Sequence, residues 1–168
     1  MSENIVTAKP GKTWFSIERT FAAPRWLVWK CYTEPQHLAR FWGPRDATTK
    51  STVDLRVGGV WRTDWTYASG QSYGYSSVYL ELTELERIHY RDAPKDWPGG
   101  LDGLPPVDML STISLAEANG ITTVTAHVDC LSVAYRDETV RRGFTGMVST
   151  GNDRLAEYLA TLSAEGER

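Results

Sequence analysis

The chain has 168 residues, 41% of them hydrophobic and 23% charged, with a net charge of −3 and an isoelectric point near 5.6. One globular domain is expected at this length, and the composition excludes disordered, collagen-like and low-complexity classes. Because the charge balance is slightly acidic, nucleic acid is a poor partner. The seven Trp, eight Tyr and four Phe predict either an aromatic core or an aromatic cavity.

The two cysteines, Cys31 and Cys130, are too few for a disulfide framework and are not spaced as metal ligands, so both are predicted to be buried, reduced thiols. The three histidines form no metal motif, and the sequence holds no nucleophile elbow, P-loop or dinucleotide motif. No apolar run reaches the roughly 18 residues that span a bilayer, and residues 1–11 lack a signal peptide's apolar segment. We therefore expect a cytoplasmic protein with no metal, no cofactor and no membrane insertion.

The first regular element is predicted over residues 14–21, a strand whose alternating apolar face is interrupted by Arg19. Two short helices follow it. Pro24 suits the first turn of the first helix, and the second is predicted to end near residues 41–44, where Gly and Pro interrupt the chain.

Residues 47–92 are rich in β-branched and aromatic residues separated by short turns, which predicts antiparallel strands, with Gly58-Gly59 as a two-residue hairpin turn. One face of the strand after this turn carries Trp61, Thr63, Trp65 and Tyr67. In the next strand, alternation places Val78, Leu80 and Leu82 on one face and Tyr79 on the other, and Tyr90 lies on the strand after that. The aromatic side chains suit either core packing or the wall of a cavity, and the pattern leaves both open.

Residues 93–107 hold four of the eight prolines, so they are predicted to form a long loop, a kind of segment that often serves as a lid or a binding loop. Strand signals return on either side of Asn119-Gly120, a second hairpin turn. The last element is predicted to be one amphipathic helix over residues 139–162. Gly151 lies in the middle of its apolar face at a cost of about 1 kcal/mol relative to Ala, which indicates a close strand or a cavity opposite it.

This order of elements resembles the helix-grip (START-like, Bet v1-like) fold. Several short segments carry a closer resemblance: 21–24 (FAAP) with 28–29 (VW), 33–35 (TEP) with Leu38 and 41–44 (FWGP), 54–59 (DLRVGG) and 86–88 (ERI). Together they resemble the family related to the C-terminal domain of the activator of Hsp90 ATPase, within the START-like or SRPBCC superfamily, over about residues 14–162.

The resemblance implies an α+β fold in which a curved antiparallel sheet of about six or seven strands surrounds a long C-terminal helix, with two short helices after the first strand. It also implies a single domain at 13–163, preceded by a flexible segment at 1–12 and followed by a tail at 164–168. Between the sheet and the long helix the family has a cavity for apolar or aromatic small molecules.

The function expected on this basis is binding of a hydrophobic or aromatic small molecule, a lipid among them, in that cavity. The residues expected to bind it are Trp42, Trp61, Thr63, Trp65, Tyr67, Tyr75, Val78, Leu80, Tyr90, Phe144, Met147, Val148, Gly151 and Asn152. Hydroxyl, imidazole and amide groups could orient the ligand from the rim, which adds Tyr79 and His89 to the candidates.

Two other functions stay open, and a homodimer is left open with them. One is a cyclase, hydrolase or dehydratase acting on an aromatic or polyketide-like substrate, which would need a titratable group with a shifted pKa inside the cavity. The other is a stress- or chaperone-associated interaction module, which an exposed apolar patch outside the cavity would favour.

Overall fold

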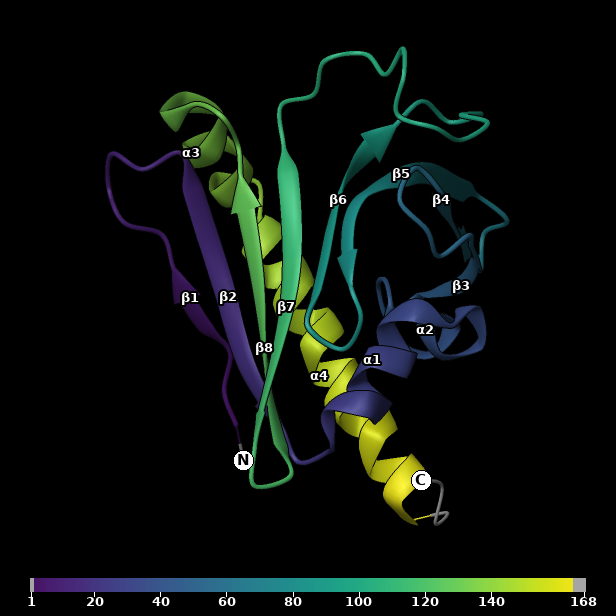
Figure 1. The fold of residues 1–168 in the computed structure, drawn as a ribbon, viewed down its shortest axis with the longest axis vertical. Helices are drawn as coiled ribbons and strands as arrows, with labels where there is room; N and C mark the ends of the chain where they lie inside the picture. The colour runs from purple at the N-terminus through teal and green to yellow at the C-terminus, as the bar shows by residue number, and fades with distance from the viewer. Residues whose placement is uncertain (1, 165–168) are drawn as a thin grey trace.

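The computed structural model describes residues 2–164, which form one eight-stranded antiparallel sheet and four helices (Figure 1). The strands lie in the order β1-β2-β8-β7-β6-β5-β4-β3. Their bounds are β1 Ile5–Thr7, β2 Trp14–Phe21, β3 Ala47–Val53, β4 Val60–Tyr67, β5 Ser72–Thr83, β6 Arg87–Ala93, β7 Leu110–Ala118 and β8 Ile121–Asp129. The helices are α1 Arg25–Thr33, α2 Pro35–Phe41, α3 Val133–Arg141 and α4 Phe144–Ala164. This is the α+β helix-grip arrangement, and no helix within 2–164 is long and apolar enough to cross a membrane.

The sheet has one strand more than the six or seven expected, because the N-terminal segment contributes β1. Val6 of β1 pairs with Ile17 of β2 in antiparallel register. Asn4, just before β1, donates a hydrogen bond through Nδ2 to Asp153 Oδ1 of α4 at 3.1 Å. Backbone pairing and this side-chain contact hold residues 4–7 against the domain, so the expectation of a flexible segment over 1–12 does not describe them. Of the tail expected at 164–168, residues 165–168 lie outside the described part of the chain.

The concave face of the sheet carries the core, and α4 lies diagonally across it (Figure 1). On β2 the predicted face is confirmed, because Phe15, Ile17 and Phe21 are all buried and so is Arg19 between them. Arg19 Nη1 meets the Asp153 carboxylate of α4 in an ion pair. A cation buried without a partner is strongly destabilising, so this pair explains how Arg19 can interrupt an apolar strand face under a helix.

The predicted helix over 139–162 is in fact two helices. Gly143 separates α3 from α4 and adopts a φ of 92°, a conformation that favours glycine and ends α3. Ser132 caps the start of α3 by accepting a hydrogen bond from the Tyr135 backbone N–H at 3.1 Å. The apolar spacing continues across this break, which is why periodicity alone placed the start of the long helix too early.

A second guanidinium group joins α4 to the C-terminal end of α2. Arg154 Nη1 donates hydrogen bonds to the carbonyl oxygens of Gly43 at 2.6 Å and Pro44 at 3.1 Å, and Nη2 donates to that of Arg40 at 3.2 Å. The last carbonyls of a helix have no partner within it, so a fork-shaped donor from another helix both satisfies them and fixes the two helices in position. Beside it, His37 Nδ1 and Tyr158 Oη lie 2.6 Å apart in the buried contact between the same two helices.

Of two loops predicted from the sequence, the turn at Gly58-Gly59 differs from the expectation and the long loop after residue 93 is confirmed. β3 ends at Val53 and β4 begins at Val60, so the turn containing Gly58-Gly59 is longer than two residues. A Cβ on Gly59 would lie 2.0 Å from the Asp54 carbonyl oxygen, which is why glycine stands there. The predicted long loop runs between β6 and β7, and its first residues pack on the outer face of the sheet, where the Lys95 carbonyl accepts hydrogen bonds from Arg62 and Ser76.

Truncation of Leu155 should test the packing of α4 on the sheet. Its side chain is fully buried, so Leu155→Ala is expected to lower the free energy of unfolding by about 2 to 5 kcal/mol in a urea titration. Met147 lies on the same helix with 46% of its surface exposed, so Met147→Ala should cost less than about 1 kcal/mol. Equal losses at the two positions would contradict the packing described.

Removal of the Arg154 fork should loosen α4 from α2. Arg154→Met keeps most of the aliphatic stem and is expected to cost about 1 to 3 kcal/mol of unfolding free energy, since three carbonyl groups lose a charged donor. Arg154→Lys keeps the charge but cannot bridge the carbonyls with a planar fork, and it should give an intermediate loss. A stability within about 0.5 kcal/mol of wild type for Arg154→Met would show that water replaces the fork at no cost.

Neither Cys31 nor Cys130 forms a disulfide, and both are buried, as predicted. Burial raises the pKa of the Cys130 thiol, which lowers the fraction of reactive thiolate. A disulfide reagent added to the native protein should therefore react slowly with Cys31 and Cys130, and in denaturant it should titrate both at once. Rapid modification of Cys130 under native conditions would contradict its burial.

Candidate functional site

A cavity of about 280 Å³ lies between the concave face of the sheet and the N-terminal half of α4. α4 changes character along its length: Leu155, Leu159 and Leu162 are buried in the main core, whereas Phe144, Val148 and Gly151 line the cavity. The core is correspondingly divided into two clusters, a large one beneath the C-terminal half of α4 and a small one around Phe15 and Ile17. Residues of both clusters line the cavity.

Eight aromatic side chains and a few polar groups make up most of its walls. The lining residues are Tyr32 of α1; Phe41, Trp42 and Gly43 at the end of α2; Trp65 of β4; Tyr73, Tyr75 and Ser77 of β5; Tyr90 and Asp92 of β6; Met109, Ser111, Thr112 and Ile113 at β7; Ala126, His127 and Val128 of β8; and Phe144, Met147, Val148, Gly151 and Asn152 of α4. Ligand sites typically combine such an apolar lining with a few polar groups that orient the ligand.

The end of α2 fixes the aromatic wall. Trp42 Nε1 donates a hydrogen bond to Tyr75 Oη at 2.7 Å, and the Trp42 carbonyl accepts one from Trp65 Nε1 at 3.2 Å and one from Thr49 Oγ1 at 2.6 Å. Gly43 has a φ of 126°, and a Cβ there would lie 2.3 Å from Trp65 Nε1. The 41–44 segment therefore needs its glycine so that the indole of Trp65 can close over the backbone.

The hydroxyl groups of the wall stay protonated at neutral pH. Burial raises the pKa of Tyr75 to about 12, although the hydrogen bond from Trp42 acts in the opposite direction. Burial also raises the pKa of Tyr90 and that of Tyr32. Neutral phenols can donate a hydrogen bond to a ligand and accept one from it. On α4, Asn152 is buried and donates through Nδ2 to Asn4 Oδ1 at 2.9 Å, which holds its amide in place.

The cavity opens to solvent at one side. Tyr73 is 58% exposed and Met147 is 46% exposed, although both line the cavity, and Asp92 is exposed beside them. The surrounding protein partly desolvates the Asp92 carboxyl and so raises its pKa, an effect that the neighbouring Arg91 opposes. The mouth therefore carries one acidic group among aromatic and thioether side chains.

The residues that the sequence predicted for this site fall into two groups. Those that line the cavity are Trp42, Trp65, Tyr75, Tyr90, Phe144, Met147, Val148, Gly151 and Asn152. Those that do not are Trp61, Thr63, Tyr67, Val78 and Leu80, together with the additional rim candidates Tyr79 and His89.

Trp61 and Thr63 are buried behind the wall rather than in it. The Trp61 ring centroid lies 4.7 Å from that of Trp42 and 5.3 Å from that of Tyr90, so Trp61 supports two lining residues from below. Tyr67 follows at the end of β4, where it pairs with Ala47 beyond the lining residue Trp65.

Val78 and Leu80 do not line the cavity, because neither shares the β5 face of Tyr75 and Ser77. The pairing with β6 is irregular between Tyr79 and Glu81, so Leu80 is an extra residue and the alternation changes face there. Tyr79 lies before this shift and two residues after Ser77, so alternation alone turns it toward the core, where it stacks on Trp61 with a centroid distance of 6.1 Å, while Val78 is buried on the other face. His89 lies next to Tyr90 and so faces outward, where its Nδ1 contacts Thr112 Oγ1 at 2.9 Å.

Several lining residues were absent from the sequence prediction. Tyr32 and Phe41 come from the helices before the sheet, and no strand alternation could place them. Tyr73 and Asp92 could have been found, because each lies two residues from a predicted member, Tyr75 and Tyr90, and residues two apart share a strand face.

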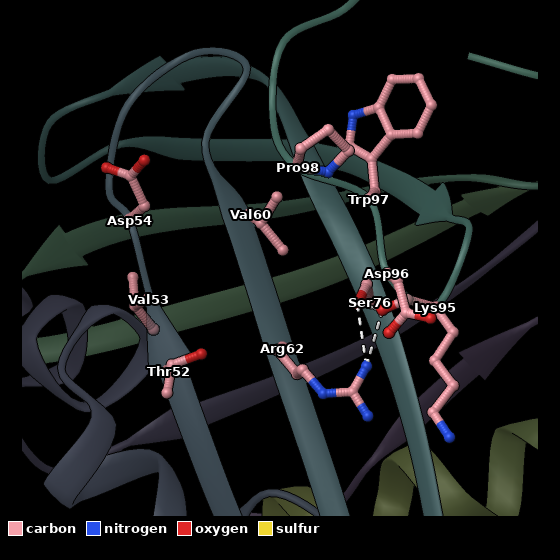
Figure 2. Close-up of a pocket in the computed structure, with 10 residues that line it drawn as sticks. All are labelled: Thr52, Val53, Asp54, Val60, Arg62, Ser76, Lys95, Asp96, Trp97 and Pro98. Atoms are coloured by element: carbon pink, nitrogen blue, oxygen red, sulfur yellow. Dashed lines mark hydrogen bonds between the residues drawn. The ribbon is translucent and has the colours of Figure 1, made fainter.

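A second hollow, of about 510 Å³, lies on the outer face of the sheet beneath the loop after β6 (Figure 2). Its central group is Arg62, whose Nη1 donates to Ser76 Oγ at 3.2 Å and to the Lys95 carbonyl at 2.8 Å, and whose Nη2 contacts Asp64 Oδ1 at 2.9 Å. Figure 2 shows Trp97 and Pro98 of the loop above these groups. The Arg62 guanidinium holds the loop on the sheet, so the way this loop packs accounts for the hollow. The inner cavity is therefore the candidate site.

No group of three or more His, Cys, Asp or Glu within residues 2–164 is arranged to hold a metal ion. The donors around the cavity mouth are a single carboxylate and hydroxyl groups. This lining can enclose an apolar body, and its hydrogen-bonding groups and carboxylate can orient that body.

Solved structures of similar fold come from several bacteria. A protein from Nitrosomonas europaea is 25% identical with a TM-score of 0.78, over 93% of this chain and 99% of that one. A protein from Chromobacterium violaceum is 28% identical with a TM-score of 0.66, over 87% of this chain and 96% of that one. An AHSA1-like protein from Aeromonas hydrophila is 18% identical with a TM-score of 0.64, over 91% and 95% of the two chains.

No curated protein matches this chain significantly. The family model for activator of Hsp90 ATPase homolog 1-like proteins matches residues 22–160, which is most of the chain and includes both short helices, the sheet from β3 to β8 and nearly all of α4. The sequence match and the shared fold agree with the segments that first indicated the family, and the chain belongs to the activator of Hsp90 ATPase homolog 1-like family.

Proposed function

We propose that this protein binds a small apolar or aromatic molecule in the cavity between the sheet and α4. The observation that carries the proposal is the aromatic wall held rigid around a space that the core side chains leave unfilled. Well-packed domains have few voids larger than a water molecule, so a space of about 280 Å³ inside the fold is a feature that packing alone does not explain.

The size of the cavity limits the ligand. At about 30 Å³ for each water molecule in the liquid, the space corresponds to on the order of ten water-sized groups, which suits a body of one or two rings. Tyr75, Tyr90, Ser77 and Ser111 supply hydroxyl groups along the sheet side of this space. An aromatic ligand with one polar substituent would match both the shape and the polarity of the walls.

Gly151 supports the assignment of this space to a ligand. A Cβ built on Gly151 would meet only the Phe41 carbonyl oxygen, at 3.9 Å, an ordinary van der Waals contact. No strand backbone or aromatic ring packs against the glycine, so its missing side chain leaves room in the cavity rather than a tight helix-to-sheet contact.

A larger side chain at position 151 should weaken ligand binding without lowering the stability of the fold. Gly151→Leu is expected to leave the unfolding temperature unchanged or raise it, because leucine gains about 1 kcal/mol in helix propensity over glycine without a clash. The same change should weaken binding of the uncharged fluorescent probe N-phenyl-1-naphthylamine by tenfold or more, measured by fluorescence titration.

Gly146→Leu is the matched control for this experiment. Gly146 lies on the same helix with open space around its Cβ position and does not line the cavity, so the substitution should give the same propensity gain and leave probe affinity within about twofold. Unchanged probe binding in Gly151→Leu, or equal weakening in both variants, would overturn the proposed site.

A further inference from the structure

The cavity carries one charge, and it is negative. Among the lining residues Asp92 has the only carboxylate, and none is Lys or Arg. A carboxylate-bearing ligand such as a fatty acid would bring a second negative charge to this site without a cation to meet it. The lining therefore opposes anions and favours a ligand with a positive group.

Asp92 is placed to act on a ligand in the cavity. It lies on β6 two residues after Tyr90 and pairs with Ser77 of β5, whose side chain is buried and also lines the cavity. Burial is the main cause of the raised pKa values of Tyr75 and Tyr90, and the negative charge of Asp92 adds to the shift in both, which places the carboxylate near these two hydroxyl groups.

The Asp92 carboxylate is not used in the fold's ion pairs. Within residues 2–164 the pairs formed by arginine and lysine involve other carboxylates. The adjacent Arg91 is turned toward the loop after β6, where its Nη2 donates to the Pro105 carbonyl at 2.6 Å. Folding also raises the pKa of Asp92, so ionised Asp92 costs stability above that pKa instead of adding to it.

Aromatic rings surround the same part of the cavity. Trp65, Tyr73 and Tyr75 form a cluster in which the ring centroids lie 5.4 to 6.1 Å apart, and Tyr90 lies on the adjoining strand. The face of an aromatic ring attracts a cation, most strongly in Trp and Tyr. A carboxylate beside several such rings provides the two attractive contributions that bind organic ammonium groups.

We infer that the cavity selects small organic amines: a protonated or quaternary nitrogen bound between Asp92 and the aromatic cluster, attached to a one- or two-ring apolar body that fills the space under α4. This inference rests on the proposed function, since the apolar body must enter the cavity before Asp92 can attract the ammonium group. It narrows the ligand class from apolar molecules in general to cationic ones.

Three probes of the same size and different charge test the inference: 3-phenylpropylamine, 3-phenylpropanol and 3-phenylpropionate, each titrated into the wild-type protein at pH 7 by isothermal calorimetry. The amine should bind at least tenfold more tightly than the alcohol, and the acid should bind more weakly than the alcohol. Asp92→Asn keeps the side-chain shape and should lower amine affinity by roughly 10- to 100-fold, as the loss of a hydrogen bond to a charged group does.

The alcohol and a second variant serve as controls. Asp92→Asn should change alcohol affinity less than threefold. Asp96→Asn removes an equal charge from the outer face, where Asp96 lines the other hollow, and it should leave amine affinity within about twofold. Equal binding of all three probes, or an amine affinity that survives Asp92→Asn, overturns the amine inference while the proposed cavity stands. Failure of every probe to bind counts against the cavity itself.

Discussion

One helix, α4, lies across a sheet that is wider than the helix can cover. The geometry of the protein depends on the contacts that hold this helix in place. The Arg154 guanidinium, near the middle of α4, holds it by donating hydrogen bonds to the Arg40 carbonyl in the last turn of α2 and to the Gly43 and Pro44 carbonyls just after that helix. The same fork holds the 41–44 segment at the position from which Trp42 reaches Tyr75. Helix placement and the aromatic wall are therefore coupled, because the residues that end α2 receive α4 from one side and present their indole to the cavity on the other.

The cavity exists because fully buried side chains are concentrated in one half of α4. Its C-terminal half carries leucines that bury fully against the sheet and the short helices, so most of the hydrophobic stabilisation comes from there. Its N-terminal half carries Gly151 and half-buried residues over an aromatic wall that hydrogen bonds hold in place. A rigid wall cannot collapse to fill the space, and unfilled space then remains available to a ligand.

The charged side chains of the fold differ in whether another group of the protein pairs with them. Arg19 is buried under α4 and meets Asp153, and Arg62 holds the loop after β6 on the outer face. These groups are accounted for by structure. Asp92 differs, since it lies at the mouth of an aromatic cavity and its ionised form opposes folding. The inference of a cationic ligand rests on Asp92, a charge that does not stabilise the fold and lies at the entrance to the cavity. A cationic ligand is a narrower class than the lipids that an apolar cavity could also bind.

The sequence by itself determined the fold class, the antiparallel meander and the half-buried face of β2, because alternation and turn residues are local properties of the chain. It also indicated most of the lining residues on α4, whose spacing marks one helix face. Only the tertiary structure decided that Gly143 divides two helices, that Tyr79 rather than Val78 faces the core, and that Trp61 lies behind the wall. It alone brought Tyr32 and Phe41 to the cavity, since contacts between residues far apart in the chain depend on how helices and strands pack, which no local pattern encodes.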